Sequence, residues 1–186
     1  MITKTFGEPG RPGKKLIIES LGPKELKYAK EYTDFINSLI AENAKILMNR
    51  KQTVKEETEF VKGAIKKTKE KKKIYLIAKD GKKVVANTSF EVMAYKQNHI
   101  ARFGIAIRNG YRGMGLGNYM MTEVMKLAKT RLKPTPKLFR LEVLENNKPA
   151  IALYKKMGFK IVAKLPKHIQ DKGKLVAEYV MIKDVK

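Results

Sequence analysis

The stretch YRGMGLGNYMM, Tyr111 to Met121, places three glycines at alternate positions immediately before a run with helical periodicity. A strand-like segment, IARFGIAI at residues 100–107, precedes it. A strand that enters a glycine-rich turn and then a helix gathers unpaired amide N–H groups and the positive end of the helix dipole at one point. The stretch therefore predicts an anion cradle.

The spacing of the glycines excludes two known nucleotide-binding loops and so limits which anion the cradle would bind. A P-loop requires lysine and then serine or threonine after its last glycine, whereas Asn118 and Tyr119 follow Gly117. The dinucleotide pattern G-x-G-x-x-G fails as well, because Asn118 stands at the position of its third glycine. Arg112 adds a bidentate donor at the rim, so the predicted guest is a pyrophosphate. The alternative is a glycine-rich turn without a ligand.

Two motifs together resemble the GNAT superfamily of acetyl-CoA-dependent N-acetyltransferases. RGMGLG is similar to the family's loop, and LEVLENNKPAIALYKKMGF follows it with Asn147, Tyr154 and Gly158 at the family's positions. The resemblance covers about residues 74–183, and residues 14–73 agree only in the order of elements. The pairing of Glu142 with Tyr154 is most similar to the ribosomal-protein N-terminal acetyltransferases.

The periodicities predict one mixed α/β domain, an α+β arrangement, over residues 14–186. Strands are expected near 15–20, 74–80, 83–95, 100–107 and 138–145, with two closing strands near 159–165 and 174–182. Helices are expected over 24–40, 53–69, 117–131 and 147–157, with Thr53 and Glu56 at capping-box spacing. The resemblance implies a mostly antiparallel sheet of about seven strands with helices on both faces. Residues 1–13, rich in glycine and proline, are expected to form a loose arm.

The resemblance implies a set of cofactor-binding residues for acetyl-CoA. It gives the pyrophosphate to the loop Arg112, Gly113, Met114, Gly115, Leu116, Gly117 and Asn118. It gives the pantetheine arm to the backbone of Ile105, Ala106 and Ile107, with Asn147 and Tyr154 flanking the arm further down.

Acetyl transfer to an amine requires a base for the amine and an acid for the departing thiolate. The resemblance implies that Tyr154 is the acid, whereas its helical periodicity alone favours core packing. For the base, Glu142 ranks ahead of Glu91, which lies on the polar face of the strand 83–95. The alternative for Glu142 is a strand carboxylate paired with a lysine or with Arg140.

Composition limits the other classes of function. The absence of cysteine excludes disulfides, thiolate metal sites and a cysteine nucleophile. No apolar run reaches the length of a membrane span and no secretory signal is visible, so a cytoplasmic protein without a membrane partner is expected. His99 and His168 have no partner at metal-ligand spacing, so no metal is expected.

The formal net charge of +23 predicts a field that attracts anions. The run KKTKEKKK, Lys66 to Lys73, is interpreted as the solvated end of a helix, with an RNA-contacting patch as the alternative. The expected acceptor is a protein or peptide amine, to which the acidic cluster at Glu56, Glu57 and Glu59 could offer negative charge. That cluster is better explained by a helix start. A small-molecule amine, or a basic RNA- or ribosome-associated module, is the alternative, and the oligomeric state stays open.

Overall fold

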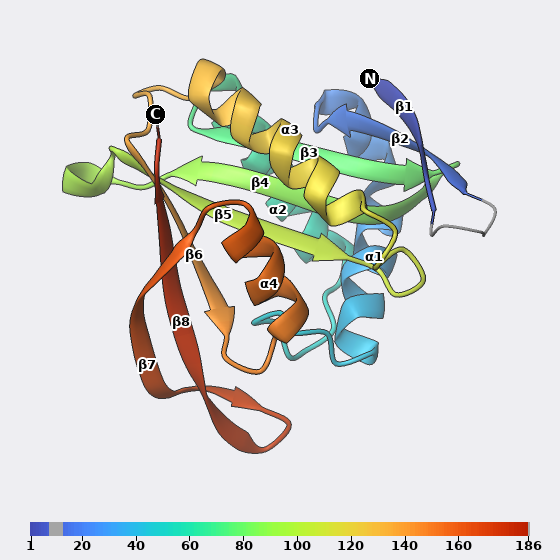
Figure 1. Cartoon of the computed structure of the whole chain (residues 1–186). Coiled ribbons are helices and arrows are strands. Elements are labelled where there is room, and N and C mark those ends of the chain that lie inside the picture. The colour runs from blue at the N-terminus through green and yellow to red at the C-terminus, as the bar shows by residue number, and fades with distance from the viewer. Residues whose placement is uncertain (8–12, 186) are drawn as a thin grey trace.

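The computed structural model describes residues 1–7 and 13–185, which form one eight-stranded mixed sheet with helices on both faces (Figure 1). The strand order is β1-β2-β3-β4-β5-β6-β8-β7. The strands are β1 Ile2–Phe6, β2 Lys14–Ser20, β3 Lys73–Asp80, β4 Lys83–Val92, β5 Ile100–Ile107, β6 Leu138–Leu144, β7 Lys160–Asp171 and β8 Lys174–Asp184. The helices are η1 Pro23–Tyr28, α1 Ala29–Ala41, α2 Val54–Lys69, η2 Tyr95–Gln97, α3 Leu116–Arg131 and α4 Lys148–Lys156.

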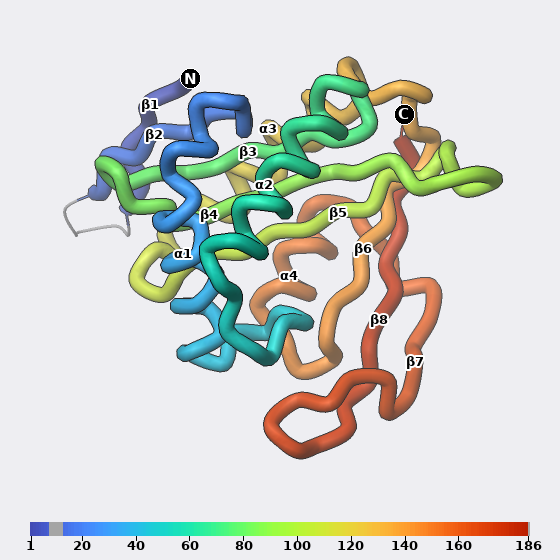
Figure 2. The backbone as a smooth tube through the Cα atoms, turned by 180° about the vertical axis from the view of Figure 1, so that it is seen from behind, coloured from blue at the N-terminus to red at the C-terminus, as the bar shows by residue number. Residues whose placement is uncertain are grey.

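Two clusters of buried apolar side chains pack the helices against the sheet, one beneath α3 and α4 and the other beneath α1 and α2. Helices α3 and α4 cover one face of the sheet, and α1 and α2 cover the other, as the reversed view in Figure 2 shows. The polar face predicted for this strand is confirmed in β4, since Thr88 and Phe90 are buried while Ser89 and Glu91 are half-buried and Glu91 pairs with Lys67 of α2. The predicted capping box is present too, because the Thr53 and Glu56 side chains each bond the other's backbone N–H.

The sheet opens between β5 and β6. These strands run parallel and pair only from Ile100 to Arg102, opposite Leu138 to Arg140. Beyond Arg102, β5 keeps its antiparallel partner β4, while β6 turns away with β8 (Figure 1). The edge of β5 that faces β6 is therefore free of sheet hydrogen bonds over its second half, which leaves room for an extended ligand.

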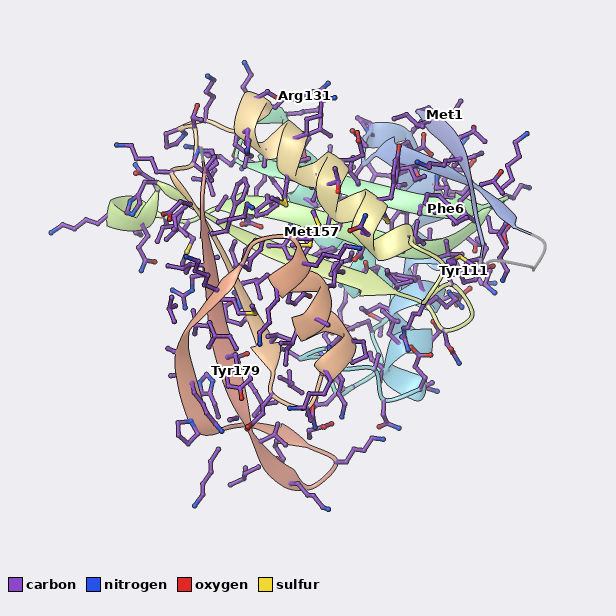
Figure 3. All side chains as sticks on the ribbon, in the orientation of Figure 1. Met1, Phe6, Tyr111, Arg131, Met157 and Tyr179 are labelled. Atoms are coloured by element: carbon purple, nitrogen blue, oxygen red, sulfur yellow. The ribbon has the colours of Figure 1, made fainter. Side chains whose placement is uncertain are left out.

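The N-terminus differs from the sequence prediction. Ile2–Phe6 is not a loose arm but strand β1, which pairs antiparallel with β2 and makes the eighth strand. Phe6, labelled in Figure 3, is buried, and its ring packs edge-on against Tyr119 of α3 with centroids 5.4 Å apart. Residues 8–12 of the expected arm lie outside the described residues.

The strand predicted over 83–95 is shorter than expected. β4 ends at Val92, and Tyr95 begins the short helix η2 with φ +53° and a side chain that is 92% exposed. The aromatic and apolar residues at 93–95 gave a strand pattern, but the chain turns there before it enters β5.

Candidate active site

The glycine loop leads from β5 into α3 and leaves its own centre open. Gly113 and Gly115 have φ of +80° and +84°, a backbone conformation that side chains disfavour. A Cβ added at Gly115 would meet nothing within 4 Å, whereas one at Gly117 would lie 3.2 Å from Ile107. The first amides of α3 lack helical acceptors. Bare backbone, free N–H groups and open space are the features that a bound pyrophosphate needs.

Two side chains hold the loop in place. Tyr111, labelled in Figure 3, donates its hydroxyl to Asp80 at the β3–β4 turn over 2.8 Å. Arg112 donates from Nε to the Ile107 carbonyl over 2.8 Å, and its terminal nitrogen pairs with Glu42 at the end of α1. Arg112, the cation expected to bind phosphate, is therefore ion-paired with Glu42 of the same chain.

A groove of about 1580 Å³ runs from this loop along the opening between β5 and β6. Most of the cofactor residues expected from the resemblance line it, namely Ile105, Ala106, Ile107, Arg112, Gly113, Gly115, Gly117, Asn118, Asn147 and Tyr154. Met114 and Leu116 pack into the core instead, so only their backbone is available to the loop. The structure thus brings the sequence-predicted cofactor residues into one cavity, where their binding role stays a prediction.

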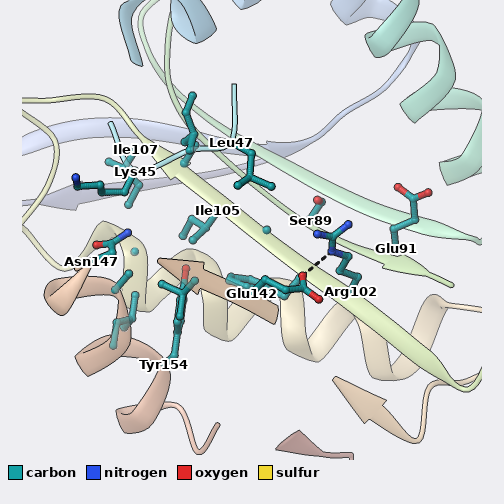
Figure 4. Close-up of a pocket in the computed structure, with 18 of the residues that line it drawn as sticks. Lys45, Leu47, Ser89, Glu91, Arg102, Ile105, Ile107, Glu142, Asn147 and Tyr154 are labelled. Atoms are coloured by element: carbon teal, nitrogen blue, oxygen red, sulfur yellow. Dashed lines mark hydrogen bonds and ion pairs between the residues drawn. The ribbon is translucent and has the colours of Figure 1, made fainter. Parts of the chain in front are cut away.

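Tyr154 of α4 lies against the floor of this groove (Figure 4). Its side chain is 7% exposed and its ring packs edge-on against Phe103 at 5.8 Å. Within residues 1–7 and 13–185, no group hydrogen-bonds its hydroxyl. Burial raises the pKa of Tyr154 to about 12. Tyr154 is therefore a protonated donor without an acceptor, which suits an acid and also suits a packing residue.

Glu142 of β6 lines the groove, with a side chain that is 10% exposed. It accepts hydrogen bonds from Nε of Arg102 on β5 and from Nε of Arg140 on its own strand, each over 2.7 Å (Figure 4 shows the first). The ion-paired alternative named for Glu142 in the sequence analysis is thus present in the structure. Both carboxylate oxygens of Glu142 are therefore occupied by guanidinium donors.

Glu91 of β4 lies further along the same face and is equally occupied. Lys67 bonds one oxygen, and Lys73 bonds the other over 3.0 Å. Burial by itself raises the pKa of Glu91, but the two lysine hydrogen bonds outweigh it and the pKa is lowered. Each candidate base therefore has both of its carboxylate oxygens bonded to cations.

The acidic cluster of α2 does not reach the groove. Glu56 caps the helix and pairs with Arg50 over 2.7 Å, and Glu59 pairs with Lys62. Glu57 is buried, and burial raises its pKa to about 7. None of the three lines the cavity, so the helix-start explanation holds for this cluster.

Sequence reasoning missed several residues at the acceptor end of the groove. Arg102 lines it, as do Phe60 of α2 and the segment from Lys45 to Met48 after α1. Phe60 and the 45–48 segment lie where the chain resembles the family only in the order of elements, and Arg102, although inside the matched range, belongs to neither motif. Within the described residues, no cluster of acidic and histidine side chains could hold a metal ion. No helix of that part of the chain is long and apolar enough to cross a membrane.

The chain is similar to acetyltransferases along most of its length. The model of the acetyltransferase (GNAT) family matches residues 40–159, more than half of the chain. The L-amino acid N-acetyltransferase AaaT of Escherichia coli (strain K12) is 30% identical over 86 residues, or 46% of this chain and 52% of that protein. The alignment thus spans about half the length of this relative.

Solved structures share the fold. YncA, a putative acetyltransferase from Salmonella typhimurium with its cofactor acetyl-CoA, superposes with a TM-score of 0.76 at 14% identity, over 92% of this chain and 94% of that one. A ribosomal-protein-alanine N-acetyltransferase from Brucella melitensis gives a TM-score of 0.76 at 16% identity, over 91% and 99% of the two chains.

Proposed function

Because the chain belongs to the acetyltransferase (GNAT) family, we propose that it moves the acetyl group of acetyl-CoA to a primary amine of a protein or peptide by direct attack. Family membership supports the acetyl transfer, and the acceptor class is the finer part of the proposal. The observation that carries the proposal is the continuous groove that joins the glycine loop to Tyr154 and to the charged groups around Glu142.

The cofactor half of the groove fits acetyl-CoA. The amides of residues 113–118 would hold the pyrophosphate, with Arg112 turning to it from Glu42. The unpaired edge of β5 at Ile105–Ile107 would bond the amides of the pantetheine arm, in the way a strand bonds an added strand. Preorganised N–H groups on that edge would stabilise the charge on the acetyl oxygen.

At the reacting centre, Tyr154 would protonate the departing thiolate, because its hydroxyl faces the groove and has no other partner among the described residues. Glu142 stays the first candidate for the base and Glu91 the second. The cations that surround both carboxylates also act on the acceptor, since nearby positive charge lowers the pKa of an ammonium group and favours the neutral amine that attacks.

The acceptor end supports a peptide because apolar side chains stand open at its rim. Leu47 is 60%, Met48 41% and Phe60 43% exposed, and all three line the groove. A free amino acid is the second candidate, favoured by the acceptor that the name of the relative AaaT gives.

Titration with acetyl-CoA in a calorimeter tests the cofactor site. Gly115→Trp should abolish binding, because the indole would fill the loop. Gly110→Trp is the matched control: its φ of +79° imposes a similar strain, an added Cβ also meets nothing within 4 Å, and Gly110 lies outside the groove. Equal binding by both variants, or no binding by the folded wild type, would contradict the proposed site. Transfer to N-terminal peptides and to free amino acids then separates the two acceptors.

A further inference from the structure

A row of charged side chains crosses the sheet at the point where β5 and β6 separate. The register places Glu91 of β4 opposite Arg102 of β5, and Arg102 opposite Arg140 of β6. Glu142 lies two residues further along β6, on the same face as Arg140. The row therefore marks the closed end of the opening that the groove follows.

This row is far from the cofactor loop. Arg112 bonds the carbonyl of Ile107, and Arg102 stands five residues earlier on the same strand, which is about 16 Å at the rise of a strand. A charge at Arg102 is thus placed to act on the acceptor rather than on the pyrophosphate.

The row carries excess positive charge. Two carboxylates, Glu91 and Glu142, are paired with Lys67, Lys73, Arg102 and Arg140, which leaves a local charge of two positive units. An acceptor that brought only an ammonium group would be repelled there. An acceptor with an anion close to its amine would be attracted.

Arg102 is the guanidinium of the row that is open to the groove and can bind such an anion. Its side chain is 53% exposed and lines the groove, and its Nε bond to Glu142 fixes the plane of the guanidinium (Figure 4). Its two terminal nitrogens have no hydrogen-bond partner within residues 1–7 and 13–185. A fixed guanidinium with a free pair of donors matches a carboxylate in bidentate geometry.

We propose that Arg102 binds a carboxylate that lies next to the reacting amine, so that the enzyme selects acceptors with an α-carboxylate or an acidic side chain near the amine. This inference rests on the proposed acetyl transfer. Either carboxylate would meet the same guanidinium, and the other three cations would remain with their own acids.

Four acceptors in two matched pairs test this assignment. L-methionine and L-methioninamide differ only in the α-carboxylate, and the peptides Ser-Asp-Gly-Phe-amide and Ser-Asn-Gly-Phe-amide differ only in the side-chain carboxylate. We expect the wild type to prefer the acid of at least one pair by about tenfold to a hundredfold in kcat/KM, the range of a hydrogen bond to a charged group. The pair that shows the preference identifies the source of the carboxylate.

The variants Arg102→Gln and Arg140→Gln then locate the selecting residue. Both remove one guanidinium from Glu142, but Arg140 does not line the groove. Arg102→Gln should lose the preference through a higher KM for the acid, Arg102→Lys should keep part of it, and Arg140→Gln should retain it.

Three results would overturn the inference: no preference in either pair, equal loss in the Arg102→Gln and Arg140→Gln variants, or transfer to neither acid. In the last case, transfer to spermidine would keep acetyl transfer from acetyl-CoA while rejecting both the peptide acceptor and the role of Arg102. A lack of transfer to every amine would reject the acetyl transfer as well.

Discussion

Replacing Tyr154 with phenylalanine separates its two roles, because only the catalytic role needs the hydroxyl. The ring stays against Phe103, and among the described residues the hydroxyl has no hydrogen-bond partner to lose. A buried hydrogen bond contributes about 0.5–1.5 kcal/mol, so its absence here predicts a change in unfolding free energy below about 0.5 kcal/mol. Urea unfolding of both proteins measures this change.

The effect of the same substitution on turnover should be large. General acids contribute about 10²- to 10⁴-fold to rate, and the contribution is greatest when the pKa lies near the working pH. Burial raises the pKa of Tyr154 to about 12, far above a neutral working pH. We therefore expect the lower end, a loss of about 10²-fold in kcat, with the dissociation constant for acetyl-CoA unchanged.

The assay is release of CoA thiol, followed with a thiol-reactive chromophore. The chain contains no cysteine, so the protein adds no background. Tyr32→Phe is the contrasting control, because its hydroxyl donates to the buried Glu25 over 3.0 Å. It should lose stability and keep kcat. Wild-type kcat in Tyr154→Phe would refute the acid role and leave Tyr154 as a packing residue.

Three further predictions concern charged side chains elsewhere in the protein. Burial raises the pKa of Glu57 to about 7, so the stability that its protonated form provides is lost as pH rises through that value. In urea unfolding, Glu57→Gln should therefore have a free energy of unfolding higher than wild type by up to about 3 kcal/mol at about pH 8, and no higher at about pH 4. Lys79→Met should lower the free energy of unfolding by about 3–5 kcal/mol in urea, because it leaves the buried carboxylate of Glu25 without its lysine partner. Glu42→Gln releases Arg112 and should tighten acetyl-CoA binding about two- to fivefold in calorimetry, since such half-exposed pairs contribute about 0.2–1 kcal/mol.

The fold was predictable where local pattern and final environment agree. The strand, glycine loop and helix around Gly115 follow one another without interruption, and each step has its own sequence signal. Strand β1 had none, because four of its five residues are exposed and only Phe6 contributes a buried side chain. Its pairing with β2 is a tertiary event that hydrophobic alternation does not report.

The two halves of the groove differ in how far a local sequence pattern could predict them. The cofactor residues are mostly contiguous from Arg112 to Asn118, so a motif could identify them. The acceptor end is assembled from strands β4, β5 and β6 together with Phe60 of α2 and the segment after α1, and its chemistry depends on which side chains meet there. Sequence placed Glu91 and Glu142 on strands, but the Arg102 that bonds Glu142 comes from 40 positions away.

These cross-strand partners change how the amine is made reactive. A free glutamate could accept a hydrogen bond from the ammonium group, but Glu91 and Glu142 each have both oxygens bonded to cations, so neither presents an unbonded oxygen to it. The same cations disfavour an ammonium beside them, so the surroundings lower the pKa of the amine and ease its deprotonation, for which Glu142 is the first candidate base. A carboxylate on the acceptor would offset the repulsion during binding, which explains how a cationic site can still hold the amine it needs to deprotonate.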